Sequence, residues 1–121
     1  MQYLLLIYAN EQNWGKLTEA QGAAMMSDYQ AFTESIAKSG HYKGGNRLQP
    51  ISSATTVRVR DGKREATDGP FAETREQLGG YYLVDAADLD EAISIAARIP
   101  GARVGSIEVR PIAGMPAHPA A

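Results

Sequence analysis

Cysteine is absent from this chain of 121 residues, and histidine occurs only at His41 and His118. Without cysteine the protein can form no disulfide bond, no thiolate metal site and no cysteine nucleophile, and this composition fits a reducing compartment. His41 directly follows Gly40, where a cationic side chain favours the end of a helix, and His118 lies close to the C-terminus. Two separated histidines argue against a zinc centre, so we predict a protein without metal or other cofactor.

Positive charge is not in excess either, because 12 lysine and arginine residues are outnumbered by 14 aspartate and glutamate residues. The resulting net charge of -2 gives no electrostatic attraction to nucleic acids or to anionic membranes. The apolar run at residues 2–9 follows no basic leader and is too short for a secretion signal or a membrane span. We therefore predict a cytoplasmic protein with neither nucleic-acid nor membrane partners.

Apolar residues, in contrast, are plentiful. They make up 44% of the sequence, which is enough for the core of one compact domain. We predict that residues 1–112 form this domain and that residues 113–121, rich in alanine and proline, form a flexible tail. Hydrophobic periodicity and turn residues predict strands at 2–9, around 48–51, and at 55–60, 63–67, 80–84 and 104–110, with a loop at 10–17 and helices over about 18–40 and 88–100.

Capping residues mark the starts of the two predicted helices. Thr18 is followed three residues later by Gln21, which is a capping-box pattern, and Gly40 is a typical helix stop. Asp88 has Glu91 three residues further on, which predicts the second helix start. The expected buried side of this second helix consists of Leu89, Ala92, Ile93, Ala96 and Ile99.

The order of the elements, strand, helix, two or three strands, helix, strand, is typical of the ferredoxin-like, split βαβ fold. We therefore predict an α+β domain in which both helices cover one face of an antiparallel sheet. The strands at 2–9 and 80–84 carry large apolar or aromatic side chains on both faces, so the second face would be a large exposed apolar patch. We expect a homodimer in which two such faces pack together.

The segment that begins Asp68-Gly69-Pro70-Phe71 combines a tight turn with several carboxylates. Its glycine can adopt a positive φ and its proline fixes its own φ, so the turn is rigid. Glu73 and Glu76 are three residues apart and would share a face if this segment formed one helical turn. Two interpretations stay open. Asp68, Glu73 and Glu76 provide acid–base chemistry or a cation site, or Asp68 caps the turn while the two glutamates are solvated.

Five large aromatic side chains could line a ligand pocket between the sheet and the helices. Such residues also fill cores and dimer interfaces, and both interpretations stay open. The pairs Gly44-Gly45 and Gly79-Gly80 match no phosphate-binding pattern, and we expect them at tight turns or at a close approach of two backbones. The five aromatic residues are Tyr8, Trp14, Tyr29, Tyr81 and Tyr82.

Four segments of the chain carry a resemblance to a known family: Tyr3–Tyr8, Ala54–Arg58, Thr67–Tyr82 and Asp88–Ala92. With these segments the sequence resembles the YCII-related domain family, and specifically its DGPF-motif branch, over about residues 1–112. The resemblance implies a ferredoxin-like fold that forms dimeric α/β barrels. It also implies an enzyme-like protein, in a family whose biochemical activity is mostly unassigned.

A related branch of this family is thought to use a His–Asp pair, with the histidine near the start of the first helix. This chain has no histidine between residues 1 and 40, so a site here must depend on the carboxylates of the DGPF segment and on nearby tyrosines. The candidate catalytic residues are Asp68, Glu73 and Glu76, and the candidate substrate-binding residues are Tyr8, Phe71 and Tyr81.

Two functions are compatible with this resemblance. The first is a cytoplasmic dimer that acts as an enzyme or small-molecule binder, with a carboxylate-containing pocket near the DGPF turn. The second is a non-catalytic regulatory or interaction protein. Members of the DGPF branch are often encoded beside extracytoplasmic-function sigma factors, which implies such a factor as the partner.

Overall fold

The structure is a computed structural model that describes residues 1–114. The predicted tail lies outside these residues from position 115 onward, and so does His118. The elements are β1 (Gln2–Ala9), α1 (Glu11–Trp14), α2 (Glu19–Lys38), β2 (Tyr42–Arg47), η1 (Ile51–Ser53), β3 (Thr55–Arg60), β4 (Lys63–Asp68), β5 (Gln77–Asp85), α3 (Leu89–Ala97), η2 (Pro100–Arg103) and β6 (Ser106–Pro111).

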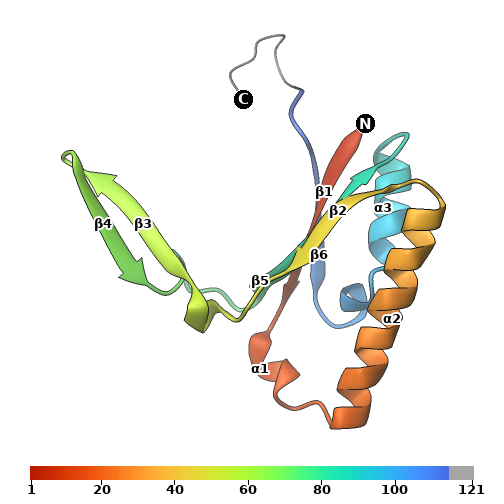
Figure 1. The fold of residues 1–121 in the computed structure, drawn as a ribbon, viewed down its shortest axis with the longest axis horizontal. Coiled ribbons are helices and arrows are strands. Elements are labelled where there is room, and N and C mark those ends of the chain that lie inside the picture. The colour runs from red at the N-terminus through yellow and green to blue at the C-terminus, as the bar shows by residue number, and fades with distance from the viewer. Residues whose placement is uncertain (115–121) are drawn as a thin grey trace.

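Four of the strands form one antiparallel sheet in the order β2-β5-β1-β6. β1 and β2 are both antiparallel to β5, which lies between them, so they run parallel to each other and are connected by α2. A second unit, β5–α3–β6, repeats this arrangement and gives the predicted ferredoxin-like α+β fold. Both helices cover the same face of the sheet, as predicted (Figure 1).

α2 begins at the predicted capping box. The Thr18 hydroxyl accepts the backbone N–H of Gln21 at 3.1 Å, and the Gln21 side chain accepts the backbone N–H of Thr18 at 2.9 Å. Each bond satisfies an amide that the first turn of a helix leaves unpaired. The helix ends close to Gly40, whose φ is 82°, and it packs on the sheet through the buried side chains of Phe32 and Ile36.

α3 starts at Asp88 as predicted, but its buried face is rotated relative to the prediction. Ile95 is 3% exposed, whereas Ile93 is 49% exposed. Residues three and four positions apart share one face of a helix, and Ile93 falls beside the face that meets the sheet. The buried face consists of Ala92, Ile95, Ala96 and, just beyond the helix, Ile99, and the predicted Leu89 and Ile93 lie outside it.

Two predictions about the connections were wrong. Residues 10–17 are not a loop throughout, because α1 follows Asn10, whose side chain accepts the backbone N–H of Gln12 at 3.0 Å. The strand predicted around 48–51 lies earlier, as β2, and it includes the glycines at 44–45. Pairing with β5 stabilises this strand although glycine has a low intrinsic strand propensity.

β3 and β4 form a separate two-stranded hairpin, which we call the arm (residues 55–68). The predicted Asp61-Gly62 turn joins its strands, with φ values of 52° and 73° that suit a tight hairpin turn. In Figure 1 the arm projects away from the four-stranded sheet, on the side opposite the helices.

The two faces of the arm differ in polarity. Val57 and Val59 share one face and are 58% and 63% exposed. On the other face, Arg58 lies opposite Glu65 in the register of the two strands, which is a favourable cross-strand pair. The arm therefore has the alternation of a half-buried ribbon, but within residues 1–114 nothing covers its apolar face.

The face of the main sheet that is turned away from the helices is also apolar at its centre. We call it the open face, and the predicted pairing of two such faces stays a prediction. Within residues 1–114, no helix combines the length and the apolar composition needed to cross a bilayer. The open face contains Leu4, Leu6, Tyr8, Tyr81 and Leu83, all of them half-buried.

The rotation of α3 gives a matched pair of variants. We expect Ile95→Ala to lower the free energy of unfolding by about 2–4 kcal/mol, because it leaves a cavity between α3 and the sheet. Ile93→Ala removes the same atoms from an exposed position on the same helix and should change it by about 0.5 kcal/mol or less. Urea denaturation followed by circular dichroism measures both, and equal effects would contradict the observed orientation of α3.

Candidate functional site

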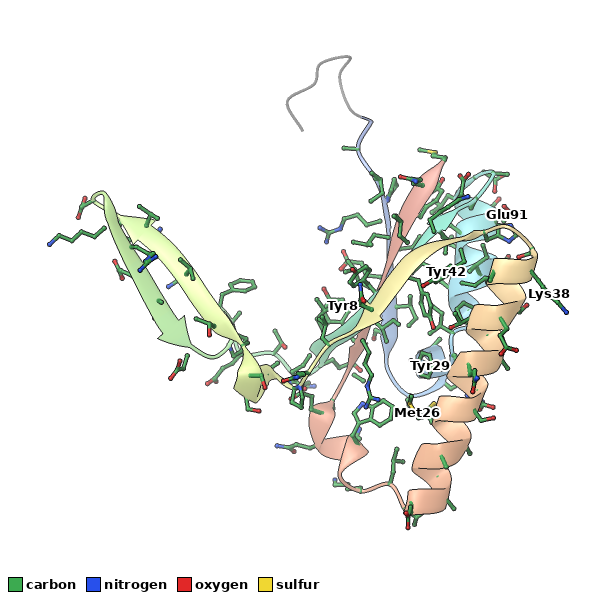
Figure 2. The ribbon with its side chains drawn as sticks, in the orientation of Figure 1. Tyr8, Met26, Tyr29, Lys38, Tyr42 and Glu91 are labelled. Atoms are coloured by element: carbon green, nitrogen blue, oxygen red, sulfur yellow. The ribbon has the colours of Figure 1, made fainter. Side chains whose placement is uncertain are left out.

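A cavity of about 900 Å³ lies between α2 and the sheet. This volume is within the range of roughly 300–1,000 Å³ that is usual for small-molecule sites. Figure 2 shows Met26, Tyr29 and Tyr42 in the space between α2 and the sheet. The walls are mainly apolar or aromatic and include Ile7, Trp14, Met26, Tyr29, Tyr42, Leu48 and Tyr82.

Two glycines on the helix-facing side of the sheet leave this space unfilled. A Cβ atom on Gly45 would lie 2.9 Å from the carbonyl oxygen of Tyr81, and one on Gly80 would lie 3.0 Å from that of Asn46. The close approach of β2 and β5 therefore excludes a side chain at position 45 unless the backbone shifts, and leaves little room for one at position 80. Further along β5, the larger side chain of Val84 is fully buried in the core, so the cavity begins where side chains give way to glycine.

Tyr82 separates the core from the cavity. Its ring meets the rings of Phe32 and Tyr42 edge to face, with centroid distances of 5.2 and 6.3 Å. Its hydroxyl lies 2.7 Å from the Thr33 hydroxyl, so the two groups share a hydrogen bond. Burial raises the pKa of Tyr82, the Thr33 hydrogen bond partly opposes this rise, and Tyr42 adds to it. The phenol is therefore neutral at pH 7 and serves as a wall of the site.

Tyr29 reaches into the cavity from α2. A Cβ atom on Gly101 would lie only 2.5 Å from its hydroxyl oxygen, so the glycine in η2 allows this hydroxyl to approach the backbone. Burial raises the pKa of Tyr29, and the Gly101 backbone and the positive charges of Arg103 and Arg47 partly oppose the rise. Tyr29 is thus a second neutral phenol in the wall.

Two charged residues, Glu11 and Arg47, line the cavity within the described part of the chain. A Glu11 carboxylate oxygen accepts the backbone N–H of Ile51 at 3.0 Å, and the Glu11 backbone N–H donates to the Gln77 side chain at 2.9 Å. Arg47 extends from the edge strand β2 toward α2, where its Nη1 lies 3.6 Å from the sulfur of Met26. The wall thus carries one anchored carboxylate and one exposed guanidinium.

The predicted catalytic carboxylates lie apart from this cavity. Asp68 ends β4 and Glu73 follows in an irregular segment, both exposed, and neither side chain makes a hydrogen bond or an ion pair within residues 1–114. Glu76 accepts a hydrogen bond from the Ser106 hydroxyl at 2.7 Å. Residues 71–76 form no helix, so the shared helical face considered for the two glutamates does not occur. Their catalytic role stays a prediction.

The turn that follows Asp68 holds the two strands of the arm together at their base. Gly69 has a φ of 100°, which glycine adopts without strain. Its backbone N–H donates to the Ala54 carbonyl at 2.7 Å, and its own carbonyl accepts from the Thr56 hydroxyl at 2.8 Å. These two bonds tie the end of β4 to the start of β3 and so close the base of the arm.

The predicted substrate-binding residues fall in three places. Tyr8 lies on the open face, where its hydroxyl is 3.4 Å from Glu108, and Figure 2 shows it on the side away from Tyr29. Tyr81 is among the residues that border the cavity, but its side chain lies on the open face, where its hydroxyl accepts a hydrogen bond from the Asn46 side chain at 2.8 Å. Phe71 is 79% exposed at the base of the arm. The structure therefore places Tyr81 beside the cavity through its position in β5, but its side chain, like that of Tyr8, lies on the open face.

Sequence reasoning missed Glu11, Met26 and Arg47. The two glycine pairs were the available signal, because adjacent strands that both lack side chains on the covered face of a sheet leave a gap there.

His41 has a structural environment: its ring nitrogens lie 2.6 Å from the Ser39 hydroxyl and 3.2 Å from a Glu91 carboxylate oxygen. Within residues 1–114, no three His, Asp or Glu side chains gather closely enough to hold a metal ion.

Comparison with known proteins gives two matches. The sequence model described as "YCII-related domain" matches residues 1–116. An uncharacterized protein of Rhizobium meliloti (strain 1021) is 38% identical over 115 residues, which cover 93% of each chain. Both matches extend over nearly the whole domain, including the cavity, the arm and the DGPF turn.

The two buried phenols predict how stability depends on pH. An unfolded chain ionises its tyrosines near pH 10, whereas folded Tyr29 and Tyr82 stay protonated to higher pH. The folded state then binds more protons, so the free energy of unfolding should fall as pH rises above about 10. We expect Tyr82→Phe to reduce this slope in urea titrations from about pH 8 to about pH 11, and to cost about 1 kcal/mol at pH 7 through the lost Thr33 bond. Parallel curves for the two proteins would contradict this assignment.

Proposed function

The chain belongs to the YCII-related domain family, and on this basis we propose that it is a cytoplasmic, homodimeric protein that binds a small organic molecule. The observation that carries the proposal is the cavity between α2 and the sheet. The location is inferred from the composition, which has no cysteine and no basic excess.

The dimensions of the cavity favour a ligand over a packing defect. The cavity is partly open to solvent, and a cleft of this kind, with mainly apolar walls and a few polar groups, is the usual form of a small-molecule site. A space of about 900 Å³ that is maintained by glycines and walled by aromatic rings fits an organic molecule. Aromatic side chains offer such a molecule large apolar contact areas together with hydroxyl groups at their edges.

Catalysis by the DGPF carboxylates is the finer part of the proposal. Asp68 and Glu73 lie at the base of the arm and do not border the cavity of their own chain. We propose that a second copy brings this base close to the bound molecule, where either carboxylate could act as a general acid or base. The pocket expected near the DGPF turn would then be formed by two chains.

Two uncovered apolar surfaces support a homodimer. The open face carries Leu4, Leu6 and Leu83, and the arm carries Val57 and Val59. Soluble monomers rarely expose large contiguous apolar patches, and an isolated two-stranded ribbon is only marginally stable in water. The arm projects on the same side of the sheet as the open face, opposite the helices (Figure 1), so a second copy placed there could contact both.

A second candidate function is that of a non-catalytic interaction protein linked to an extracytoplasmic-function sigma factor. The exposed apolar face of the arm is the observation that favours an interaction role. The two candidates differ in their response to Val57→Lys combined with Val59→Lys. This change should abolish capture of a purified sigma factor if the second candidate holds, and it should leave the cavity of each chain intact.

Filling the cavity tests the leading proposal. Ala23 and Ser27 line it from α2, and we expect Ala23→Phe or Ser27→Phe to weaken binding of the uncharged fluorophore N-phenylnaphthylamine by about tenfold, because the new ring competes for the same space. Energy transfer from Trp14 measures this binding at the site, since Trp14 is the only tryptophan and lines the cavity.

Ala24→Phe is the matched control, because Ala24 is exposed on α2 and does not line the cavity. It should leave the affinity unchanged. Equal affinity for all the variants would overturn the proposed binding site. In the same titration, Asp68→Asn combined with Glu73→Gln should alter the affinity if the carboxylates meet the ligand, and an unchanged value would remove them from the site.

The homodimer is tested by a charge on the open face. Light scattering should give twice the mass of one chain for the parent protein and a monomer for Leu6→Glu, because the new carboxylate would be buried in the interface close to Glu108. Ile93→Glu on the exposed side of α3 should remain dimeric. A monomeric parent protein at micromolar concentration would overturn this part of the proposal, and circular dichroism shows whether each variant is folded.

A further inference from the structure

The two charged residues in the cavity wall, Glu11 and Arg47, differ in their hydrogen-bond partners. Glu11 is already bonded, since its carboxylate accepts the Ile51 backbone N–H and so anchors η1. Arg47 forms no ion pair with any carboxylate of residues 1–114, and its side-chain contact is with the sulfur of Met26. A thioether is a weak acceptor, so the guanidinium remains available to a ligand.

The position of Arg47 suits a group at the rim of the cavity. It lies at the end of β2, which is the edge strand of the sheet, and its side chain is exposed. In the strand register it is opposite Gly80, so no neighbouring side chain of β5 separates it from the cavity. Arg47 can therefore meet a polar group of a molecule whose remaining part lies deeper.

The tyrosine hydroxyls of the deeper wall already have partners, whereas Ser27 and Gln30 border the cavity from α2. The Tyr82 hydroxyl is bonded to Thr33, and the Tyr29 hydroxyl lies against the backbone of Gly101. Burial raises the pKa of both phenols, so neither carries a negative charge at pH 7. What the deeper wall presents to a ligand is therefore mainly the rings of these tyrosines and of Tyr42.

We propose that the cavity selects organic anions with a flat apolar body, whose anionic group is held by Arg47. The inference depends on the proposed function, because it concerns the ligand of the same cavity. A guanidinium binds carboxylate, sulfonate or phosphate groups through paired hydrogen bonds, and aromatic walls favour a flat body. A cationic ligand would be repelled by Arg47, and one oxygen of the Glu11 carboxylate, the negative group of the described cavity wall, is already bonded to the Ile51 backbone.

Two fluorophores with the same apolar body test this selectivity. N-phenylnaphthylamine is uncharged, and anilinonaphthalene sulfonate has the same rings with one anionic group. We expect Arg47→Gln to weaken binding of the sulfonate by about five- to tenfold while the uncharged probe changes by less than about twofold, because an exposed guanidinium contributes a modest charge-assisted bond. Energy transfer from Trp14 again reports binding at the cavity.

Three further variants show whether the selectivity depends on the charge and the planar shape of the Arg47 side chain. Lys38→Gln, which removes an exposed positive charge at the end of α2 away from the cavity, should leave both affinities unchanged. Arg47→Lys keeps the charge without the planar fork and should give an intermediate loss. Glu11→Gln retains an acceptor for Ile51 but removes the negative charge, so it should strengthen binding of the sulfonate alone.

The outcomes separate this inference from the function on which it depends. If Arg47→Gln weakens both probes equally or neither, anion selectivity is overturned while binding in the cavity stands. If Ala23→Phe and Ser27→Phe leave both probes unaffected, the proposed binding site itself fails. A selective loss for the sulfonate that is confined to the Arg47 variants would support the inference.

Discussion

The packing of one ring, that of Tyr82, determines how the space between the sheet and α2 is divided. The ring is held edge to face between Phe32 and Tyr42, and its hydroxyl is bonded to Thr33 on the helix. On one side of it lies the solid core around Val84. On the other side β5 continues into glycine, and the same two layers enclose a cavity. The solid core and the proposed ligand site thus occupy different halves of the interface between helix and sheet.

The DGPF segment has a structural part in addition to the catalytic role predicted for its carboxylates. Its glycine closes the base of the arm through bonds to Ala54 and Thr56, and Glu76 is bonded to Ser106 at the start of β6. Asp68 and Glu73 remain exposed beside this clasp. The segment therefore orients the arm relative to the sheet, and in the proposed dimer its exposed carboxylates would lie near the second copy.

Much of the fold could be predicted because its signals are local. The capping box at Thr18, the cap at Asp88 and the Asp61-Gly62 turn each depend on residues within a few positions of one another, and each was confirmed. Predictions failed where a distant partner decides the outcome. β2 forms over two glycines because β5 pairs with it, and Ile95 replaces Ile93 in the core because of how α3 meets the sheet.

The sequence by itself determined the family, the ferredoxin-like order of elements, and the caps and the hairpin turn that bound several of them. Only the tertiary structure decided that Arg47 and Glu11 border one cavity with Tyr29 and Tyr82, and that Asp68 and Glu73 do not. The physical reason is that caps and turns are satisfied by neighbours in the chain. A cavity is bounded by side chains from separate elements, and its volume depends on residues such as Gly45 and Gly80, which have no side chain to fill it.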